Sequence, residues 1–193
     1  MAGYLRQNQP DDEPLTLEEV KDYLRVDTNS EDALITSFII AARRQVEART
    51  LRPLITQTWL LSLDFSDISD IVEINKFPLQ SVDSIKYFDI DGNIQTIDSS
   101  KYIVDINSNP CRIQFTDLPS TIKNQINAMQ IEFTCGYGDL ASDVPDDIKL
   151  AMKFIIGHYY ENRQDVVTGT QVNEIPQSSQ FLLEPYRNSV YGW

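Results

Sequence analysis

The side chains that could carry catalysis are few, and none lies in a catalytic pattern. His158 is the only histidine among the 193 residues, so serine–histidine or cysteine–histidine catalysis would have to use it. It lies in the middle of a predicted helix, between Gly157 and Tyr159, and no serine or cysteine nucleophile is near it in the sequence. We therefore expect a packed or interface histidine and no catalytic residue.

Two short motifs imitate ligand-binding loops. Residues 136–141, GYGDLA, match the G-x-G-x-x-A pattern, but a dinucleotide fingerprint requires a βαβ unit, and the strands predicted before this motif are antiparallel. Residues 89–93, DIDGN, place glycine fourth, whereas a calcium-binding EF-hand loop has it sixth, and Ser100 stands where that loop has its closing glutamate. We interpret the first motif as a turn that leaves a sheet and the second as a hairpin turn.

The two cysteines, Cys111 and Cys135, give no framework for disulfides or metals. Two cysteines are too few for a disulfide scaffold, and no CxxC pair or Cys/His cluster supports a metal site. Cys135 lies in an alternating strand pattern, where a small buried residue is the simpler interpretation. We expect free thiols, no metal and no cofactor.

Helical periodicity is found at both ends of the chain. Thr16, with a glutamate three residues later, has the pattern of a capping box and begins a helix. Ser30 is expected to cap a second, longer helix. After residue 138 the helical period returns, with Asp143 as the expected N-cap, Pro145 in the first turn and an end near Asn162. These helices are too short to be stable alone, so we expect them to pack together.

Between them the period changes to two. Apolar residues alternate along residues 59–65 and 129–135, and Asp91-Gly92 and residues 107–110 are turn signals between short strands. Six or seven short strands with regular turns favour a compact sandwich or curled antiparallel sheet. The predicted fold class is therefore α+β, an α-helical bundle module with an inserted antiparallel, sandwich-like β-rich domain.

The predicted domain boundaries follow from these changes of period. Residues 1–14 are polar and acidic and are expected to form a flexible arm. The helical module would comprise residues 15–56 and 139–163, and the β-rich insert residues 57–138. Residues 164–193 would form a C-terminal arm with a short helix.

The charge excludes some classes of partner. A formal net charge of −13 gives no basic footprint for nucleic acid. Acidity can mean simple solubility, or a surface along which DNA slides without sticking, and the charge alone does not separate these. No stretch approaches the roughly 20 apolar residues of a membrane helix, and the first residues lack a signal-peptide pattern. We expect a protein made and used in the cytoplasm, with no membrane partner.

An ordered series of segments covers most of the chain, from about residue 15 to residue 187. The segments are TLEEVKDYLR at 16–25, SEDALI at 30–35, AARRQVEA at 41–48, LITQTW at 54–59, FTCGYG at 133–138, VPDDIK at 144–149, HYYENR at 158–163 and LEPYR at 183–187. Taken in this order, they resemble the head-tail connector proteins of long-tailed bacteriophages, also called adaptor or head-completion proteins.

The resemblance implies a structural virion protein with no catalytic residues. Such subunits form a homo-oligomeric, dodecameric ring beneath the portal protein, at the neck of a virion that is assembled in the host cytoplasm. The ring extends the DNA channel, through which DNA passes without specific binding, and it offers a platform to the tail-side stopper protein. The family fold is a helical bundle, in some members with a β-rich insert.

Two groups of side chains are candidates for assembly contacts. The predicted inter-subunit contacts are Arg43, Arg44, Glu47 and Arg49. The arginines crowd the end of one helix, where they could pair with acids of a neighbouring subunit or simply complement the helix dipole. The predicted portal-binding tail is apolar and aromatic: Leu182, Leu183, Tyr186, Tyr191 and Trp193. The alternative is that this tail folds back onto its own helices.

A second functional hypothesis starts from Trp59, Tyr87 and Tyr102. Aromatic side chains in a sandwich could bind a small ligand or carbohydrate, which would make the chain a binding module of a virion. Core packing at alternating positions is the favoured explanation of these three. An enzyme would need a pocket of converging polar groups, which no motif indicates.

Overall fold

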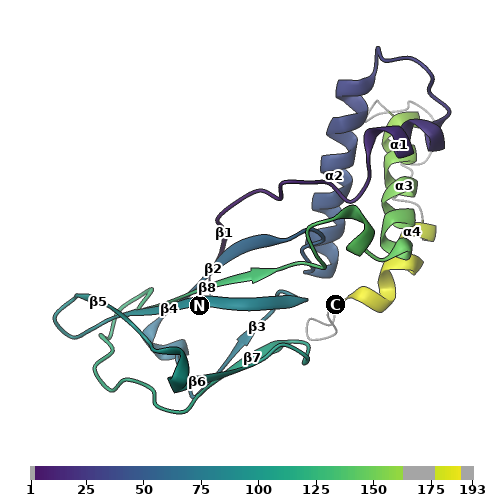
Figure 1. The fold of residues 1–193 in the computed structure, drawn as a ribbon. Helices are drawn as coiled ribbons and strands as arrows, with labels where there is room; N and C mark the ends of the chain where they lie inside the picture. Colours follow the sequence, from purple (N-terminus) through teal and green to yellow (C-terminus); the bar gives the residue numbers. More distant parts are fainter. Residues whose placement is uncertain (1–2, 163–176, 188–193) are drawn as a thin grey trace, which may run out of the picture. The chain divides into compact units, whose positions relative to one another are not determined.

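The computed structural model describes residues 3–162 and 177–187, and the chain divides into two compact units. The first, which we call the β unit, comprises Met1–Pro10 and Thr56–Tyr137. The second, the helical unit, comprises Asp11–Ile55 and Gly138–Trp193. Figure 1 shows the strands in one unit and the four α-helices of the described residues in the other. The fold class is α+β, as the change of period predicted.

Two antiparallel sheets make up the β unit. The five-stranded sheet has the order β1 (Gly3–Arg6), β2 (Gln57–Leu63), β8 (Met129–Cys135), β4 (Leu79–Phe88) and β5 (Ile94–Thr96). The three-stranded sheet has the order β3 (Ile71–Ile74), β7 (Cys111–Phe115) and β6 (Tyr102–Asp105). Single 3-10 turns lie at Phe65–Asp67 (η1) and Ser99–Lys101 (η2).

Alternation along the strands builds one core from both sheets. In β8 the buried positions are Met129, Ile131, Phe133 and Cys135, each separated by one partly exposed residue, as a period of two requires. Buried side chains of the second sheet, such as Ile74 and Ile113, belong to the same hydrophobic cluster. The hairpin predicted at Asp91-Gly92 joins β4 and β5, and Gly92 has the positive φ, 88°, that glycine adopts without strain.

The expectation of a flexible arm at residues 1–14 is wrong for its first part. Gly3–Arg6 form β1, which pairs with β2 in the register Gly3↔Ser62 to Arg6↔Trp59. The Tyr4 ring packs against the core and meets Phe133 edge-on, with 6.3 Å between ring centroids. The pairing satisfies backbone groups that the edge of β2 would otherwise expose. Four residues are too few to show a period in the sequence.

Helices α1 (Leu17–Leu24), α2 (Asp32–Thr50), α3 (Asp146–Glu161) and α4 (Gln177–Leu183) form the helical unit, with 3-10 turns at Ala141–Asp143 (η3) and Glu184–Tyr186 (η4). The predicted capping box is confirmed: the Glu19 amide donates to Thr16 Oγ1 at 3.1 Å, and Thr16 donates its own amide to Glu19 Oε2 at 2.9 Å. Helices α2 and α3 pack through buried residues and through Phe38 and Tyr159, whose ring centroids are 5.8 Å apart. None of the described helices is both long and apolar enough to cross a membrane.

Two expected N-caps are wrong. Glu31 stands at the N-cap of α2 and makes no side-chain capping bond there, so Ser30 is not the cap. Pro145 stands at the N-cap of α3, and the Asp143 carboxylate instead accepts the Leu140 amide at 3.0 Å and closes η3. Asp143 lies two residues before the N-cap position, so its side chain closes the turn that precedes the helix.

Candidate functional site

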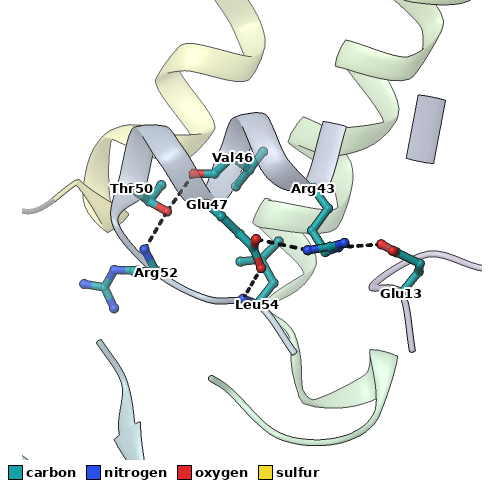
Figure 2. Close-up of polar contacts among 7 residues, drawn as sticks. All are labelled: Glu13, Arg43, Val46, Glu47, Thr50, Arg52 and Leu54. Carbon is teal, nitrogen blue, oxygen red and sulfur yellow. Dashed lines mark hydrogen bonds and ion pairs between the residues drawn. The ribbon is translucent and has the colours of Figure 1, made fainter. Parts of the chain in front are cut away.

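Arg43 lies at the centre of a buried ionic network in the helical unit (Figure 2). Its side chain is only 2% exposed. Its Nε donates to Glu13 Oε2 at 2.7 Å, and an Nη donates to Glu47 Oε2, one helical turn later, at 3.1 Å. The expectation that Arg43 faces a neighbouring subunit is therefore wrong, since its side chain is buried within its own chain. Glu47 also bonds within the chain but is partly exposed, so its contact with a neighbour stays a prediction.

The same network fixes the path of the chain beyond α2. The second carboxylate oxygen of Glu47 accepts the Leu54 amide at 3.0 Å. Thr50 donates its hydroxyl to the Val46 carbonyl at 2.8 Å and accepts the Arg52 amide at 3.3 Å. The amides of Arg52 and Leu54, which lie beyond the end of α2, therefore find side-chain acceptors on the helix. Arg43 and Glu47 thus tie the segment before α1 and the segment after α2 to one face of α2.

Arg44 and Arg49 differ from Arg43, because both are exposed. An Nη of Arg49 donates to Gln180 Oε1 of α4 at 3.1 Å. No ion pair joins Arg44 to another residue within the ranges that the structure describes. These two cations on α2 can still meet acids of a neighbouring subunit, so for them the predicted role stays a prediction.

The predicted portal-binding tail is partly folded into the helical unit. Leu183 is 1% exposed, which contradicts its expected exposure, and Leu182 is half-buried. Arg52 Nε donates to the Tyr186 carbonyl at 2.7 Å, and the guanidinium carbon lies 5.8 Å from the centroid of the Tyr186 ring. Burial, and then the nearby Asp147 carboxylate, raise the pKa of Tyr186. The remaining tail residues of the prediction, Tyr191 and Trp193, lie outside the described residues.

Within residues 177–187, Phe181 is an exposed aromatic that was absent from the predicted tail. It lies on α4 and is 77% exposed. Two helical residues separated by one position point about 200° apart, so Phe181 and Leu183 cannot share a face. Helical spacing could therefore have shown that only one of them faces the protein.

His158 and the two cysteines make packing and hydrogen-bond contacts within their own units. His158 is half-buried beside the Tyr159 ring, and its Nδ1 lies 3.3 Å from the Asn162 side-chain amide. Cys111 and Cys135 are buried, and their thiols lie 3.8 and 3.9 Å from the carbonyls of Ile106 and Gln57. Among residues 3–162 and 177–187, no three His, Cys, Asp or Glu side chains are grouped so that they could hold a metal ion.

The two motifs that resemble ligand-binding loops, at residues 136–141 and 89–93, are turns. Gly136, with φ 138°, leaves β8 and donates its amide to the Pro78 carbonyl at 2.9 Å, and β8 is antiparallel to both neighbours. The Asp89 carboxylate closes the β4–β5 hairpin by accepting the amides of Asp91 and Asn93 and the side chain of Gln95. These bonds, first those of Gln95 and Asn93, lower the pKa of Asp89.

The three aromatics that suggested a ligand site pack against the core. Trp59, Tyr87 and Tyr102 are partly buried against the hydrophobic cluster of the β unit. The ammonium of Lys76 lies 4.2 Å from the centre of the Trp59 ring, a cation–π contact. Their positions agree with the favoured explanation, core packing, and give no support to a carbohydrate site.

Solved structures from gene transfer agent (GTA) particles have the same fold. Each comparison covers 96% of this chain and 95% of the other. The structures are the neck of an empty GTA particle computed with C6 symmetry (24% identity, TM-score 0.80), the virion of a native GTA particle (24%, 0.77) and the neck of a native GTA particle computed with C12 symmetry (22%, 0.75).

A family model supplies the identification that structural likeness alone cannot. No curated protein sequence matches the chain. The model described as "Head completion protein" matches residues 13–189, a range that holds the capping box, the Arg43 network, both sheets except β1, and α4. The chain belongs to the head completion protein family.

Proposed function

We propose that this chain is a non-enzymatic structural subunit of the head-tail connector, located in the virion neck. The observation that carries the proposal is the family match over residues 13–189. It is supported by a shared fold with chains from the necks of GTA particles, over almost the full length of both chains. In this role the protein binds beneath the portal, extends the DNA channel and offers the platform for the tail-side stopper protein.

A closed ring requires two different surfaces on each subunit that fit each other. We assign one of them to the exposed end of α2, where Arg44 and Arg49 are available for acids of the next subunit. Arg49 is already oriented by Gln180. Twelve copies would agree with the C12 symmetry used for one of the similar necks.

The acidic surface suits a channel for DNA. With 29 acidic and 16 basic residues, a lumen lined by this protein would repel phosphates, and the genome would pass without stopping. Contact with the portal is assigned to the C-terminal region, with exposed Phe181 added to Tyr186, Tyr191 and Trp193.

Mass measurement tests the ring. Purified protein is examined by native mass spectrometry alone and with its portal protein, and a complex with about twelve subunits on the portal ring is the expected result. Arg44→Glu should weaken ring formation roughly tenfold, since it places an acid against acids. Lys86→Glu, an equal charge change at an exposed position of β4, is the matched control. A wild-type chain that stays monomeric with the portal present contradicts the proposal.

A further inference from the structure

One end of the β unit carries an unusual group of exposed apolar side chains. At this end β2 and β4 finish and β8 begins, and Figure 1 shows the β4–β5 hairpin projecting there. Three loops meet at this end, residues 64–67, 89–94 and 122–127. Their large exposed hydrophobic residues are Phe65 (41% exposed), Ile94 (62%), Ile90 (66%) and Ile126 (76%). We call these four residues the apolar tip.

Hydrogen bonds hold together the loops that carry the four residues of the apolar tip. The Phe65 amide donates to the Gln125 carbonyl at 3.1 Å, and the Asn127 amide donates to Asp64 Oδ1 at 2.9 Å. The third loop is tied to the end of β4, because the Lys123 amide donates to the Phe88 carbonyl at 2.8 Å. A surface held in one conformation loses little entropy when it binds.

The composition of these loops argues for a binding role. Turns usually carry Gly, Asn, Asp or Ser, which suit their backbone and face water, whereas Ile90 and Ile126 occupy loop positions and are mostly exposed. Isolated exposed hydrophobic residues are ordinary, whereas several gathered at one end of a folded unit are typical of a contact site.

The charged residues around the apolar tip indicate which kind of partner surface it can bind. The three loops contain four aspartates, at positions 64, 67, 89 and 91, and one lysine, Lys123. An acidic rim repels nucleic acid and anionic lipid, and it is complementary to a surface with lysine or arginine around an apolar centre.

We propose that the apolar tip docks into an apolar site, rimmed by lysine or arginine side chains, on a different polypeptide of the assembled particle. The proposal rests on the proposed function, since it takes the chain to be part of a virion. It adds a contact made by the β unit to the contacts assigned above to the helical unit.

Site-specific cross-linking in particles tests this contact. The photoreactive residue p-benzoylphenylalanine replaces Ile126 in one preparation and Ile103 in the control. Ile103 is 60% exposed but lies on β6 of the other sheet. Purified particles are irradiated, and the cross-linked peptides are identified by mass spectrometry. Position 126 should give one dominant adduct, on another protein, in a segment with apolar residues flanked by lysine or arginine.

Charge reversal tests the rim. Asp91→Lys should reduce the yield of the adduct from position 126 roughly tenfold, whereas Glu73→Lys, an exposed acid of β3 outside the tip, should leave it unchanged. The inference is overturned by adducts scattered over several proteins, by an adduct with lipid, nucleic acid or a second copy of this chain, or by no adduct above that of position 103.

The amount of this chain in the particles separates the two proposals. If quantitative mass spectrometry finds the chain in purified particles but position 126 gives no specific adduct, only the tip inference fails. If the chain is absent from the particles, the proposed function fails first.

Discussion

Replacing Arg43 by methionine should destabilise the helical unit strongly, because it removes the guanidinium and keeps most of the aliphatic stem. Loss of one partner from a buried ion pair costs roughly 3–5 kcal/mol, since the remaining charge stays buried without compensation. Here the side chains of Glu47 and Glu13 are 12% and 27% exposed. Glu13 can turn toward water, and Glu47 keeps the Leu54 amide. We therefore expect Arg43→Met to lower the free energy of unfolding by about 2–4 kcal/mol.

Urea denaturation followed by circular dichroism at 222 nm, a helix signal, measures this loss. At typical urea dependences it moves the unfolding midpoint of the helical unit down by about 1–3 M. The matched control is Arg44→Met, one residue later on α2 and exposed. It should change the free energy of unfolding by less than about 0.5 kcal/mol. Hydrogen exchange at the Leu54 amide gives a local measurement, and exchange there should accelerate in Arg43→Met.

A third variant separates charge from hydrogen bonding. Glu47→Gln keeps an oxygen that can accept the Leu54 amide and removes only the charge facing Arg43. Its cost should lie between those of Arg43→Met and Arg44→Met. Equal free energies of unfolding for Arg43→Met and Arg44→Met would refute the assignment of Arg43 to the interior of the helical unit.

Three further predictions concern single side chains. Thr16→Ala removes the capping box and should cost about 1 kcal/mol of unfolding free energy. Leu183→Ala opens a cavity beneath α4 and should cost at least about 2 kcal/mol. Hydrogen bonds from Ser108 and then Arg112 hold the pKa of Asp105 well below its usual range. The Asp105 carboxylate accepts the Asn107 amide and should therefore protect it fully from hydrogen exchange above about pH 5. This protection should decline as the pH falls below the pKa of an aspartate in the unfolded chain, near 3.9.

Each of these has an internal control. Thr28→Ala changes an exposed threonine outside any helix and should leave the free energy of unfolding almost unchanged. Phe181→Ala changes the exposed face of α4 and should cost far less than Leu183→Ala, and a reversed order would contradict the orientation of that helix. In Asp105→Asn the decline of amide protection below about pH 3.9 should disappear, and a persisting decline would mean that other carboxylates cause it.

Local patterns in the sequence predicted local structure well. The capping box at Thr16, the hairpin at Gly92 and the alternation along residues 129–135 all involve neighbours in the chain, so residue type and spacing determine them. The ordered segments of the family resemblance also lie within the range of the matching family model.

The failures concern partners that are distant in the sequence. Arg43 meets Glu13 across 30 positions, and β1 pairs with a strand that begins at Gln57. Nothing around residue 43 distinguishes an arginine that faces Glu13 from one that faces a neighbouring subunit. The Asp143 cap failed for a local reason: α3 begins two residues later than expected, and the Asp143 carboxylate closes η3 by binding the Leu140 amide.

Of two nearby positions on a helix, one can therefore stabilise the fold while the other is available for contacts with other subunits. This difference decides how variants that impair assembly must be interpreted. Arg43 and Arg44 point about 100° apart, so one is buried between carboxylates and the other is exposed. Loss of ring formation in an Arg43 variant would report a damaged subunit, whereas the same loss in an Arg44 variant with unchanged stability would report a broken contact. The pair Leu183 and Phe181 obeys the same rule on α4. An assembly surface of this protein should accordingly be mapped with the exposed member of each pair, with the buried member as the control for folding.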